Sequence, residues 1–202
     1  MPDFDYENRY KGRVVAGVDE AGRGPWAGPV VAAAVILDYS NFPEDLNDSK
    51  KLSKLKREEI FDKLINVCDY GVGVVSESII DQVNILQATK LAMKSAIFDL
   101  FNKPEVMLVD GNQKLEIENI ECLTIVKGDA KSLSIAAASI IAKVTRDKIM
   151  EDLGEEFPQY GWPNNSGYGT KQHQDALNKH GITKYHRKSF APIKRIIEVI
   201  NG

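Results

Sequence analysis

The chain has 202 residues, of which 43% are hydrophobic and 27% charged, and its formal net charge is −3 at pH 7. A chain of this length forms one domain, with or without a small appendage, and is long enough to bury an ordinary hydrophobic core. No segment reaches the ~20 consecutive apolar residues that cross a membrane, and the polar N-terminus excludes a signal peptide.

Basic residues are concentrated in two parts of this acidic chain. One cluster lies at residues 50–57, and the other lies beyond residue 170. A solvated helix face explains either cluster alone, whereas the two together favour an anionic partner.

The two cysteines, Cys68 and Cys122, lie far apart in apolar runs. We interpret them as reduced thiols rather than as a disulfide. Because disulfides are rare in the cytosol, this pattern predicts a cytoplasmic protein.

Alternating secondary-structure signals fill the first 160 residues. Valine-rich runs bounded by glycine or proline predict strands, and apolar residues at helical spacing predict helices. Asn84 and Gln87 resemble a helix-capping pair. In chain order we expect strands at 14–18 and 29–37, a helix at 53–67, a strand at 69–77 whose glycines allow close backbone approach, a helix at 84–101, strands at 105–110 and 122–126, and a helix at 131–153.

This order predicts an α/β fold with a mixed sheet covered by helices. After residue 160 the composition changes, because glycine, proline and asparagine crowd residues 161–169 and short basic helical segments follow. We therefore divide the chain into a main domain, residues 1–160, and a small helical C-terminal extension, residues 161–202.

Acids follow or end three of the expected strands. They are Asp19 with Glu20, Asp110 and Asp129. If these strands are neighbours, the acids gather at one edge of the sheet, where α/β proteins place their ligands. Because adjacent strand residues point to opposite faces, Asp19 and Glu20 are expected to act together only if the strand ends there.

Gathered carboxylates repel one another unless a hard cation neutralises them, and Mg²⁺ and Mn²⁺ prefer such oxygen ligands. Zinc is not expected, because all three histidines lie beyond residue 172 and no cysteine pair has ligand spacing. Acids holding two ions describe a two-metal site for phosphoryl transfer.

Simpler roles stay open for the later acids. Asp110 precedes a glycine, as a turn former does, and Asp129 precedes a helix, as an N-cap does. We interpret Asp147, inside the long helix, as a surface ion-pair residue. Asp19 and Glu20 are harder to explain without a ligand, because two acids beside a buried strand destabilise a fold.

The segment GRGPWAG, residues 22–28, separates the first two strands. Its glycine spacing differs from that of a dinucleotide-binding loop, its prolines oppose a helix start, and no G-K-[ST] makes it a P-loop. Free backbone N–H groups and one arginine suit a phosphate or a sugar hydroxyl.

Together these stretches resemble the ribonuclease HII family. GVDEAGRGPWAGPVVAAAV is similar to the family signature, and the later blocks follow in the family's order. They are DSKKLS (48–53), LVDGN (108–112), KGDAKSLSIAAASIIAKVTRD (127–147), SGYGTKQH (166–173) and HRKSF (186–190). The blocks look like the bacterial branch, and the short lead before the first strand argues against the N-terminal domain of ribonuclease HIII.

The resemblance implies a ribonuclease H-like mixed five-stranded sheet flanked by helices, in which residues 1–160 form the catalytic domain and residues 161–202 help to bind substrate. It implies hydrolysis of RNA in RNA–DNA hybrids and 5′ of a single ribonucleotide in duplex DNA, with Mn²⁺ or Mg²⁺ and two ions when substrate is bound. The acidic ligands map onto Asp19, Glu20, Asp110 and Asp129, the last in preference to Asp147.

The family's substrate-binding residues also map onto this chain. Gly22, Arg23 and Gly24 are expected at the 2′-hydroxyl that separates RNA from DNA and at the adjacent phosphates, and Tyr168 on the sugar at the RNA–DNA junction. Trp26 stands where a smaller residue is expected, which leaves the packing of the loop open. Expected phosphate contacts are Lys50, Lys51, Arg187 and Lys188, and Ser139 and Lys143 are expected to face the substrate.

The expected mechanism is in-line attack by metal-activated water, which leaves 3′-hydroxyl and 5′-phosphate ends. A route through the 2′-hydroxyl is disfavoured, since it needs a histidine pair. Two other functions are weighed: a DNA-cutting nuclease or integrase of the same superfamily, and a nucleic-acid-binding module without catalysis. We expect a monomer, and a sliding-clamp or polymerase contact is not readable from the sequence.

Overall fold

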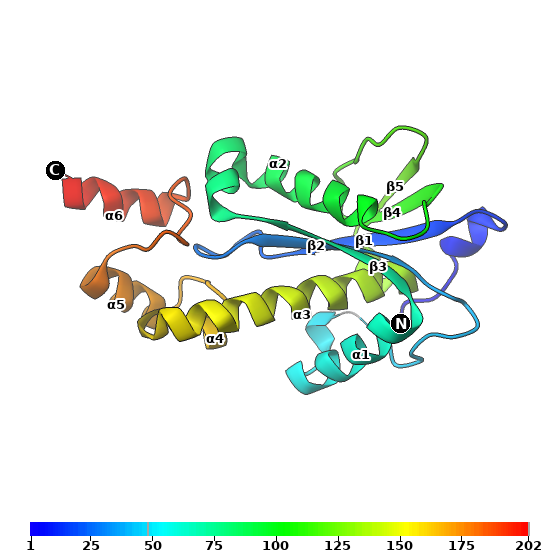
Figure 1. The fold of residues 1–202 in the computed structure, drawn as a ribbon, viewed down its shortest axis with the longest axis horizontal. Coiled ribbons are helices and arrows are strands. Elements are labelled where there is room, and N and C mark those ends of the chain that lie inside the picture. Colours follow the sequence, from blue (N-terminus) through cyan, green and yellow to red (C-terminus); the bar gives the residue numbers. More distant parts are fainter. Residues whose placement is uncertain (48, 202) are drawn as a thin grey trace.

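The structure, a computed structural model, describes residues 1–47 and 49–201. Figure 1 shows a sheet with helices on both faces and further helices beyond one end of it. The strands are β1 (Val15–Ala21), β2 (Val30–Ile36), β3 (Asp69–Val75), β4 (Val106–Asp110) and β5 (Glu121–Ile125). The α-helices are α1 (Lys54–Val67), α2 (Glu77–Phe98), α3 (Leu133–Glu156), α4 (Trp162–Asn165), α5 (Lys171–His180) and α6 (Ala191–Asn201).

Short 3₁₀ helices join these elements: η1 (Glu7–Tyr10), η2 (Ser49–Lys51), η3 (Gly128–Ala130) and η4 (Pro158–Tyr160). Among the described helices, none combines the length and the apolar character that crossing a membrane requires.

The five strands form one mixed sheet in the order β3-β2-β1-β4-β5. β1 pairs antiparallel with β2, and β2 with β3, whereas β4 lies parallel to β1 and β5 parallel to β4. This confirms the predicted mixed five-stranded sheet. Because β1 and β4 run in the same direction, the acids near their ends lie at the same edge.

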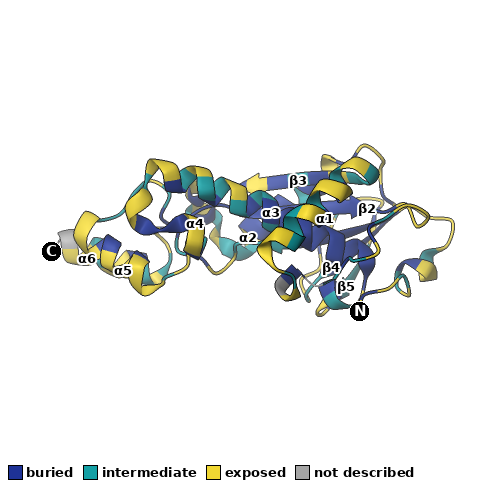
Figure 2. Cartoon of the chain, turned by 90° about the horizontal axis from the view of Figure 1, so that it is seen from below, coloured by how far each residue is buried: buried dark blue, intermediate teal, exposed yellow. Residues whose placement is uncertain are grey.

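Helices cover both faces of the sheet. In Figure 1, α2 lies on one face, and α3 lies on the other with α1 packed against it. A Cβ on Gly73 would lie 2.0 Å from the carbonyl oxygen of Ala92 in α2, so the glycine lets helix and strand touch, as the sequence predicts. Figure 2 shows that the sheet between the helix layers is mostly buried.

The expectation that β1 ends before its acids is wrong. β1 continues through Asp19 and Glu20, because β2 pairs with it as far as Ala21↔Val31. Its pairing with β4 stops earlier, at Val18↔Val109. The two acids therefore leave one strand in different directions, and both still line one cavity, because β4 no longer pairs with β1 beyond Val18↔Val109.

Helix α2 begins earlier than predicted, at Glu77 rather than Asn84. Asn84 has φ +67° inside it, and its Oδ1 accepts the N–H groups of Leu86 and Gln87. Asn84 thus caps the longer second segment, as its spacing with Gln87 predicts, while a short helical segment precedes it.

The C-terminal segments pack on the end of α3. Their apolar cluster includes Trp162, Leu177 and Ile193 together with Met150 of α3 and Ala27 of the β1–β2 loop. A core shared across residue 160 explains why the extension has a defined place beside the sheet. The division at that residue stays a prediction.

Candidate active site

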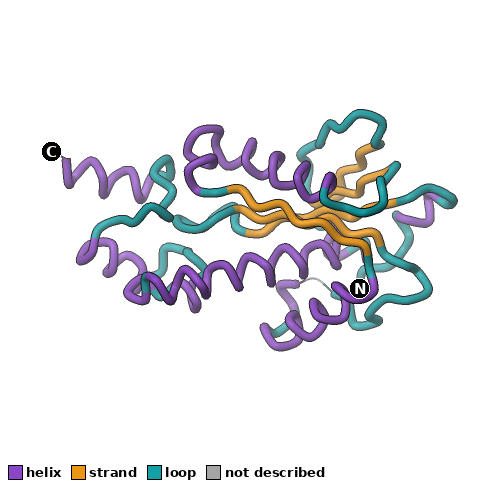
Figure 3. Tube along the Cα trace, viewed as in Figure 1, coloured by secondary structure: helices purple, strands orange, loops and turns teal. Residues whose placement is uncertain are grey.

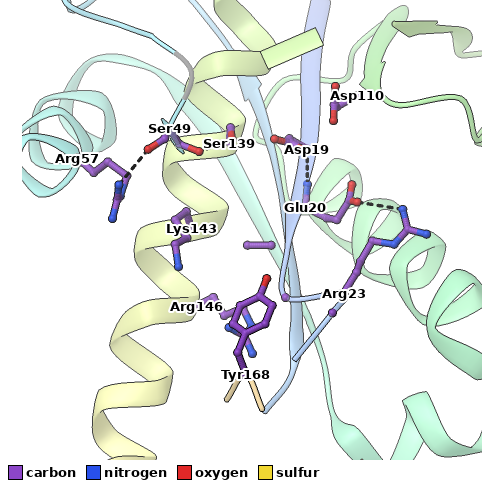
Figure 4. A pocket seen from close by; sticks show the side chains of 13 residues that line it. Asp19, Glu20, Arg23, Ser49, Arg57, Asp110, Ser139, Lys143, Arg146 and Tyr168 are labelled. Atoms are coloured by element: carbon purple, nitrogen blue, oxygen red, sulfur yellow. Dashed lines mark hydrogen bonds and ion pairs between the residues drawn. The ribbon is translucent and has the colours of Figure 1, made fainter. Parts of the chain in front are cut away.

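The acids of β1 and β4 meet at one edge of the sheet. Asp19 is only 4% exposed, and it lies beside Ser139 of α3, with Asp110 on its other side (Figure 4). Burial, Glu20 and Asp110 raise the pKa of Asp19 well above its usual range, and hydrogen bonds from Ser139 and the Glu20 N–H offset this only in part. This carboxylate is thus held at an electrostatic cost that a bound cation would remove.

Asp129 lies close behind Asp110. The N–H of Gly128 donates to Asp110 Oδ1 at 2.6 Å, so the start of η3 touches the end of β4. Asp129 follows in η3 and is buried. Ser132, not Asp129, caps α3, since its hydroxyl accepts the N–H of Ile135. The N-cap alternative for Asp129 is therefore wrong.

Asp147 forms the ion pair expected of it, with its Oδ1 2.7 Å from Lys143 Nζ, and accepts the hydroxyl of Ser166 at 3.1 Å. Its side chain is only 17% exposed, so the expected surface position is wrong. The end of the C-terminal loop that carries Ser166 covers it.

The glycine-rich loop is held from behind by two buried arginines. Arg187 is not exposed, and its guanidinium donates to the carbonyls of Gly22, Arg23, Gly28 and Pro29 at 2.6–3.1 Å. Arg146 donates to those of Ala27, Pro29 and Ser166 at 2.9–3.1 Å. Burial and Arg146 lower the pKa of Arg187, while buried Glu77 opposes this.

The expectation that Arg187 contacts phosphate directly is therefore wrong. Each of its three guanidinium nitrogens donates to at least one carbonyl, and a buried guanidinium must be satisfied in this way. Its role is to turn these carbonyls inward. Among the described residues, the N–H groups of Gly22, Arg23 and Gly24 make no hydrogen bond, which leaves them available at the cavity.

Positions 22 and 24 need glycine for different reasons. Gly22 has φ +94°, and a Cβ there would lie 2.0 Å from Arg146 Nε. A Cβ on Gly24 would lie 3.3 Å from the ring of Tyr168, so the loop and the tyrosine are in contact. The Arg23 side chain is exposed and pairs with Glu20 at 3.3 Å.

Trp26 fits this loop because a glycine faces it. A Cβ on Gly169 would lie 2.2 Å from the indole ring. The backbone of Trp26 donates to Gly167 and accepts from Arg187, both at 2.8 Å. The large residue therefore joins the loop to the C-terminal extension.

A cavity of about 440 Å³ joins these groups. Of the residues expected from the sequence, Asp19, Glu20, Asp110, Gly22, Arg23, Gly24, Ser139, Lys143 and Tyr168 line it. Sequence reasoning missed Ser49, Arg57 and Arg146, which also line it. Arg57 stood in the basic cluster, and its guanidinium donates to the carbonyls of Ser49 and Leu52.

Among the described residues that line the cavity, Asp129, Arg187, Lys51 and Lys188 do not appear. Lys51 is exposed in η2, and Lys188 is exposed after Arg187, its N–H donating to Asp81 at 2.9 Å. The side chain of Lys50 lies outside the described residues.

The donor chemistry fits a hard cation, because carboxylates crowd one edge of the cavity and histidines and thiols are absent from its lining. Within residues 1–47 and 49–201, no three such groups enclose an ion as they stand.

We predict that Asp19→Asn stabilises the metal-free protein. The folded chain keeps a proton on Asp19 at pH values where the unfolded chain has lost it, so the contribution of Asp19 to stability falls as pH rises above the ordinary aspartate range. At neutral pH in chelator, the variant should melt about 2–4 °C higher, equivalent to ~1 kcal/mol. Asp175→Asn, at an exposed acid, is the control, and a lower melting temperature for Asp19→Asn would refute the argument.

We predict that Arg187→Lys destabilises the loop, because an ammonium group cannot reach four separate carbonyls. The free energy of unfolding should fall by about 2–4 kcal/mol, measured by denaturant unfolding with the fluorescence of Trp26 and Trp162. Lys188→Gln, at the neighbouring exposed position, should leave it unchanged. An equal change in the free energy of unfolding for the two substitutions would show that Arg187 does not stabilise the fold through the loop carbonyls.

Comparisons with known proteins agree with this geometry. The family model for ribonuclease HII matches residues 16–193. A ribonuclease HII of Rickettsia canadensis is 53% identical over 187 residues, which cover 93% of this chain and 94% of the relative.

Solved structures share the fold. The ribonuclease H2 of Pyrococcus horikoshii OT3 superposes with a TM-score of 0.77 at 32% identity, covering 93% of this chain and 98% of that one. The ribonuclease HII of Archaeoglobus fulgidus, in a complex with PCNA, gives 0.73 at 31% identity, covering 86% and 93%. Bst-RNase HIII in complex with Mn²⁺ gives 0.73 at 20% identity, covering 98% and 74%, a likeness of fold. The family match over nearly the whole chain shows that this protein belongs to the ribonuclease HII family and is a ribonuclease H-type hydrolase.

Proposed function

We propose that this ribonuclease cuts the RNA strand of RNA–DNA hybrids and also cuts duplex DNA 5′ of a single embedded ribonucleotide. One observation carries the proposal: the cavity that holds Asp19, Glu20 and Asp110 also holds the Gly22–Gly24 segment and Tyr168. Carboxylates suit cation-assisted phosphodiester hydrolysis. Backbone N–H groups and an aromatic ring suit a ribose and its phosphates.

We propose Asp19, Glu20, Asp110 and Asp129 as the ligands of Mg²⁺ or Mn²⁺, with two ions when substrate is present. The buried like charges around Asp19 support this, because they destabilise the chain without a cation. Bound there, the ions would supply an activated water and stabilise the leaving oxygen.

The residues of the chain would position the substrate. Gly22, Arg23 and Gly24 offer N–H donors and one cation to the ribose and the adjacent phosphates, and Tyr168 closes the opposite side of the sugar. Ser139 and Lys143 extend the polar lining along α3. In-line attack on the phosphate 5′ of the ribonucleotide then leaves a 3′-hydroxyl and a 5′-phosphate.

The duplex outside the cavity is proposed to contact Lys50, Lys51 and Lys188. Phosphate contacts of this kind hold a duplex without reading its sequence. Since Tyr168 belongs to residues 161–202, the C-terminal extension would contribute directly to substrate binding.

The proposal also covers the location of the protein in the cell, its oligomeric state and its protein partner. Burial raises the pKa of the Cys68 thiol to about 12 and also raises that of Cys122, and neither forms a disulfide. Unreactive thiols of this kind support a cytoplasmic location, and we propose that the protein is a monomer. The complex of the Archaeoglobus relative with PCNA makes a sliding clamp the first protein partner to test.

One incubation tests the cleavage site. A labelled DNA duplex with one ribonucleotide should be cut 5′ of it with Mg²⁺ or Mn²⁺, and chelator should abolish the cut. The ends should be a 3′-hydroxyl and a 5′-phosphate. Comparable cutting of an all-DNA duplex would favour a DNA nuclease or integrase, and a cyclic phosphate product would overturn the proposed chemistry.

Substitution of the acids tests the ligand set. Asp110→Asn and Asp129→Asn should each lower kcat by about 100-fold or more, because each removes a charge that holds a cation. Asp147→Asn should lower it far less, since Asp147 pairs with Lys143. If Asp110→Asn left both cleavage and metal binding unchanged, a non-catalytic binding module would be the better description. A larger loss of kcat for Asp147→Asn than for Asp129→Asn would make Asp147, not Asp129, the fourth proposed ligand.

A further inference from the structure

Two buried histidines lie side by side behind Tyr168. His173 is near the start of α5, His186 lies between α5 and α6, and neither is exposed. Their Nε2 atoms are 3.0 Å apart. A buried imidazole nitrogen needs a partner of the matching kind, so the hydrogen-bond geometry determines where the protons are.

The partners of the two Nδ1 atoms determine which ring nitrogens carry protons. His173 Nδ1 lies 3.0 Å from the carbonyl oxygen of Tyr168, which only accepts, so this nitrogen carries a proton. His186 Nδ1 receives the N–H of Thr183 at 2.9 Å, so it carries none. The proton of neutral His186 is therefore on Nε2, from which it is donated to His173 Nε2. The chain of donors runs from Thr183 through both rings to Tyr168.

An added proton on either ring would disrupt this chain. On His173 it would point at two donors, the imidazole N–H of His186 and the indole N–H of Trp162, which is 3.4 Å away. On His186 it would remove the acceptor of the Thr183 N–H, 2.9 Å away, and the Thr183 hydroxyl oxygen, 3.1 Å away, would have to accept it instead. The arrangement is complete only when both rings are neutral.

The surroundings favour the neutral rings. Burial lowers the pKa of His173, and burial together with His173 lowers the pKa of His186 to about 3. The rings of Tyr160, Trp162 and Trp26 face the pair from η4, α4 and the β1–β2 loop. The guanidinium of Arg187 is turned to the loop carbonyls, and no described carboxylate bonds to either imidazole.

The same histidines connect the two sides of the cavity. Tyr168 is held by its carbonyl on His173 and by its N–H on Asn165. His186 pairs as a β-bridge with Ala27 of the glycine-rich loop. Figure 3 shows this loop and the segment between α5 and α6 side by side at one end of the sheet. Displacing either ring would therefore move Tyr168 relative to Gly24.

We propose that His173 and His186 are positioning residues that hold Tyr168 against Gly24, and that they do so only while both rings are neutral. The inference rests on the proposed role of Tyr168 at the ribose. It adds to the acids and the glycine-rich loop a further requirement for recognising the ribose, namely a neutral histidine pair behind Tyr168.

Long-range ¹H–¹⁵N NMR of the intact protein tests the proton arrangement. His173 should be the Nδ1-protonated tautomer and His186 the Nε2-protonated tautomer, and both should stay neutral well below pH ~6.5, the ordinary histidine pKa. The opposite tautomer in either ring, or a charged ring at neutral pH, would overturn the proposal.

Binding measurements in chelator test the positioning role without cleavage. His186→Leu should lower the preference for a ribonucleotide-containing duplex over an all-DNA duplex by about tenfold. His186→Gln should retain it, because its amide can donate to His173 and accept from Thr183. Equal preference in His186→Leu and the natural protein, or equal loss in both variants, would refute the proposal.

Two controls separate the possible causes of failure. In a Tyr168→Ala background, His186→Leu should cause no further loss, since effects acting through one residue are not additive. If the natural protein shows no preference for the ribonucleotide, the proposed function itself fails. Thermal melting verifies folding, and if His186→Leu does not fold, the tautomers and His186→Gln decide the question.

Discussion

Repulsion between carboxylates at the end of β1 is the constraint on which the site depends. Burial first, and then the negative charges of Glu20 and Asp110, raise the pKa of Asp19, so the fold favours its neutral form. Parallel pairing of β1 with β4 brings these acids to one edge, while the antiparallel partner β2 holds β1 straight through them. A fold selected for stability alone would not crowd charges in this way, and the proposed cation and anionic substrate at this edge would account for the arrangement.

Around the glycine-rich loop, some arginines are buried and support the fold, whereas one is exposed at the cavity. Arg146 and Arg187 are buried, and the carbonyls of the glycine-rich loop satisfy them. Neither guanidinium forms an ion pair with the acids of β1 among the described residues. The guanidinium of the exposed Arg23, in contrast, lies at the cavity and pairs with Glu20. One short segment of chain therefore carries the acids proposed to bind a cation and, next to them, the loop proposed to bind an anion.

Local motifs explain what the sequence could predict. Valine-rich runs, helical spacing and the acids at strand ends depend on neighbouring residues, and they predicted the mixed sheet and the meeting of Asp19 with Asp110. The length of β1 was mispredicted because it depends on β2, a partner that the local pattern does not contain. Arg187 was misread for a related reason. A basic run looks exposed in sequence, and only the tertiary contact with the β1–β2 loop shows that this arginine is buried.

The position of the C-terminal extension follows from the same contacts. His186 and Arg187 are adjacent, yet one reaches Tyr168 through His173 and the other holds the carbonyls of Gly22 and Arg23. The Gly22–Gly24 segment and Tyr168, on two sides of the cavity, are therefore both positioned by one dipeptide that pairs with the loop at Ala27. Because Asp19 and Glu20 lie in the last residues of β1, which leads directly into this loop, any displacement of the dipeptide changes the distance between the groups proposed to recognise a ribose and those proposed to hold the metal.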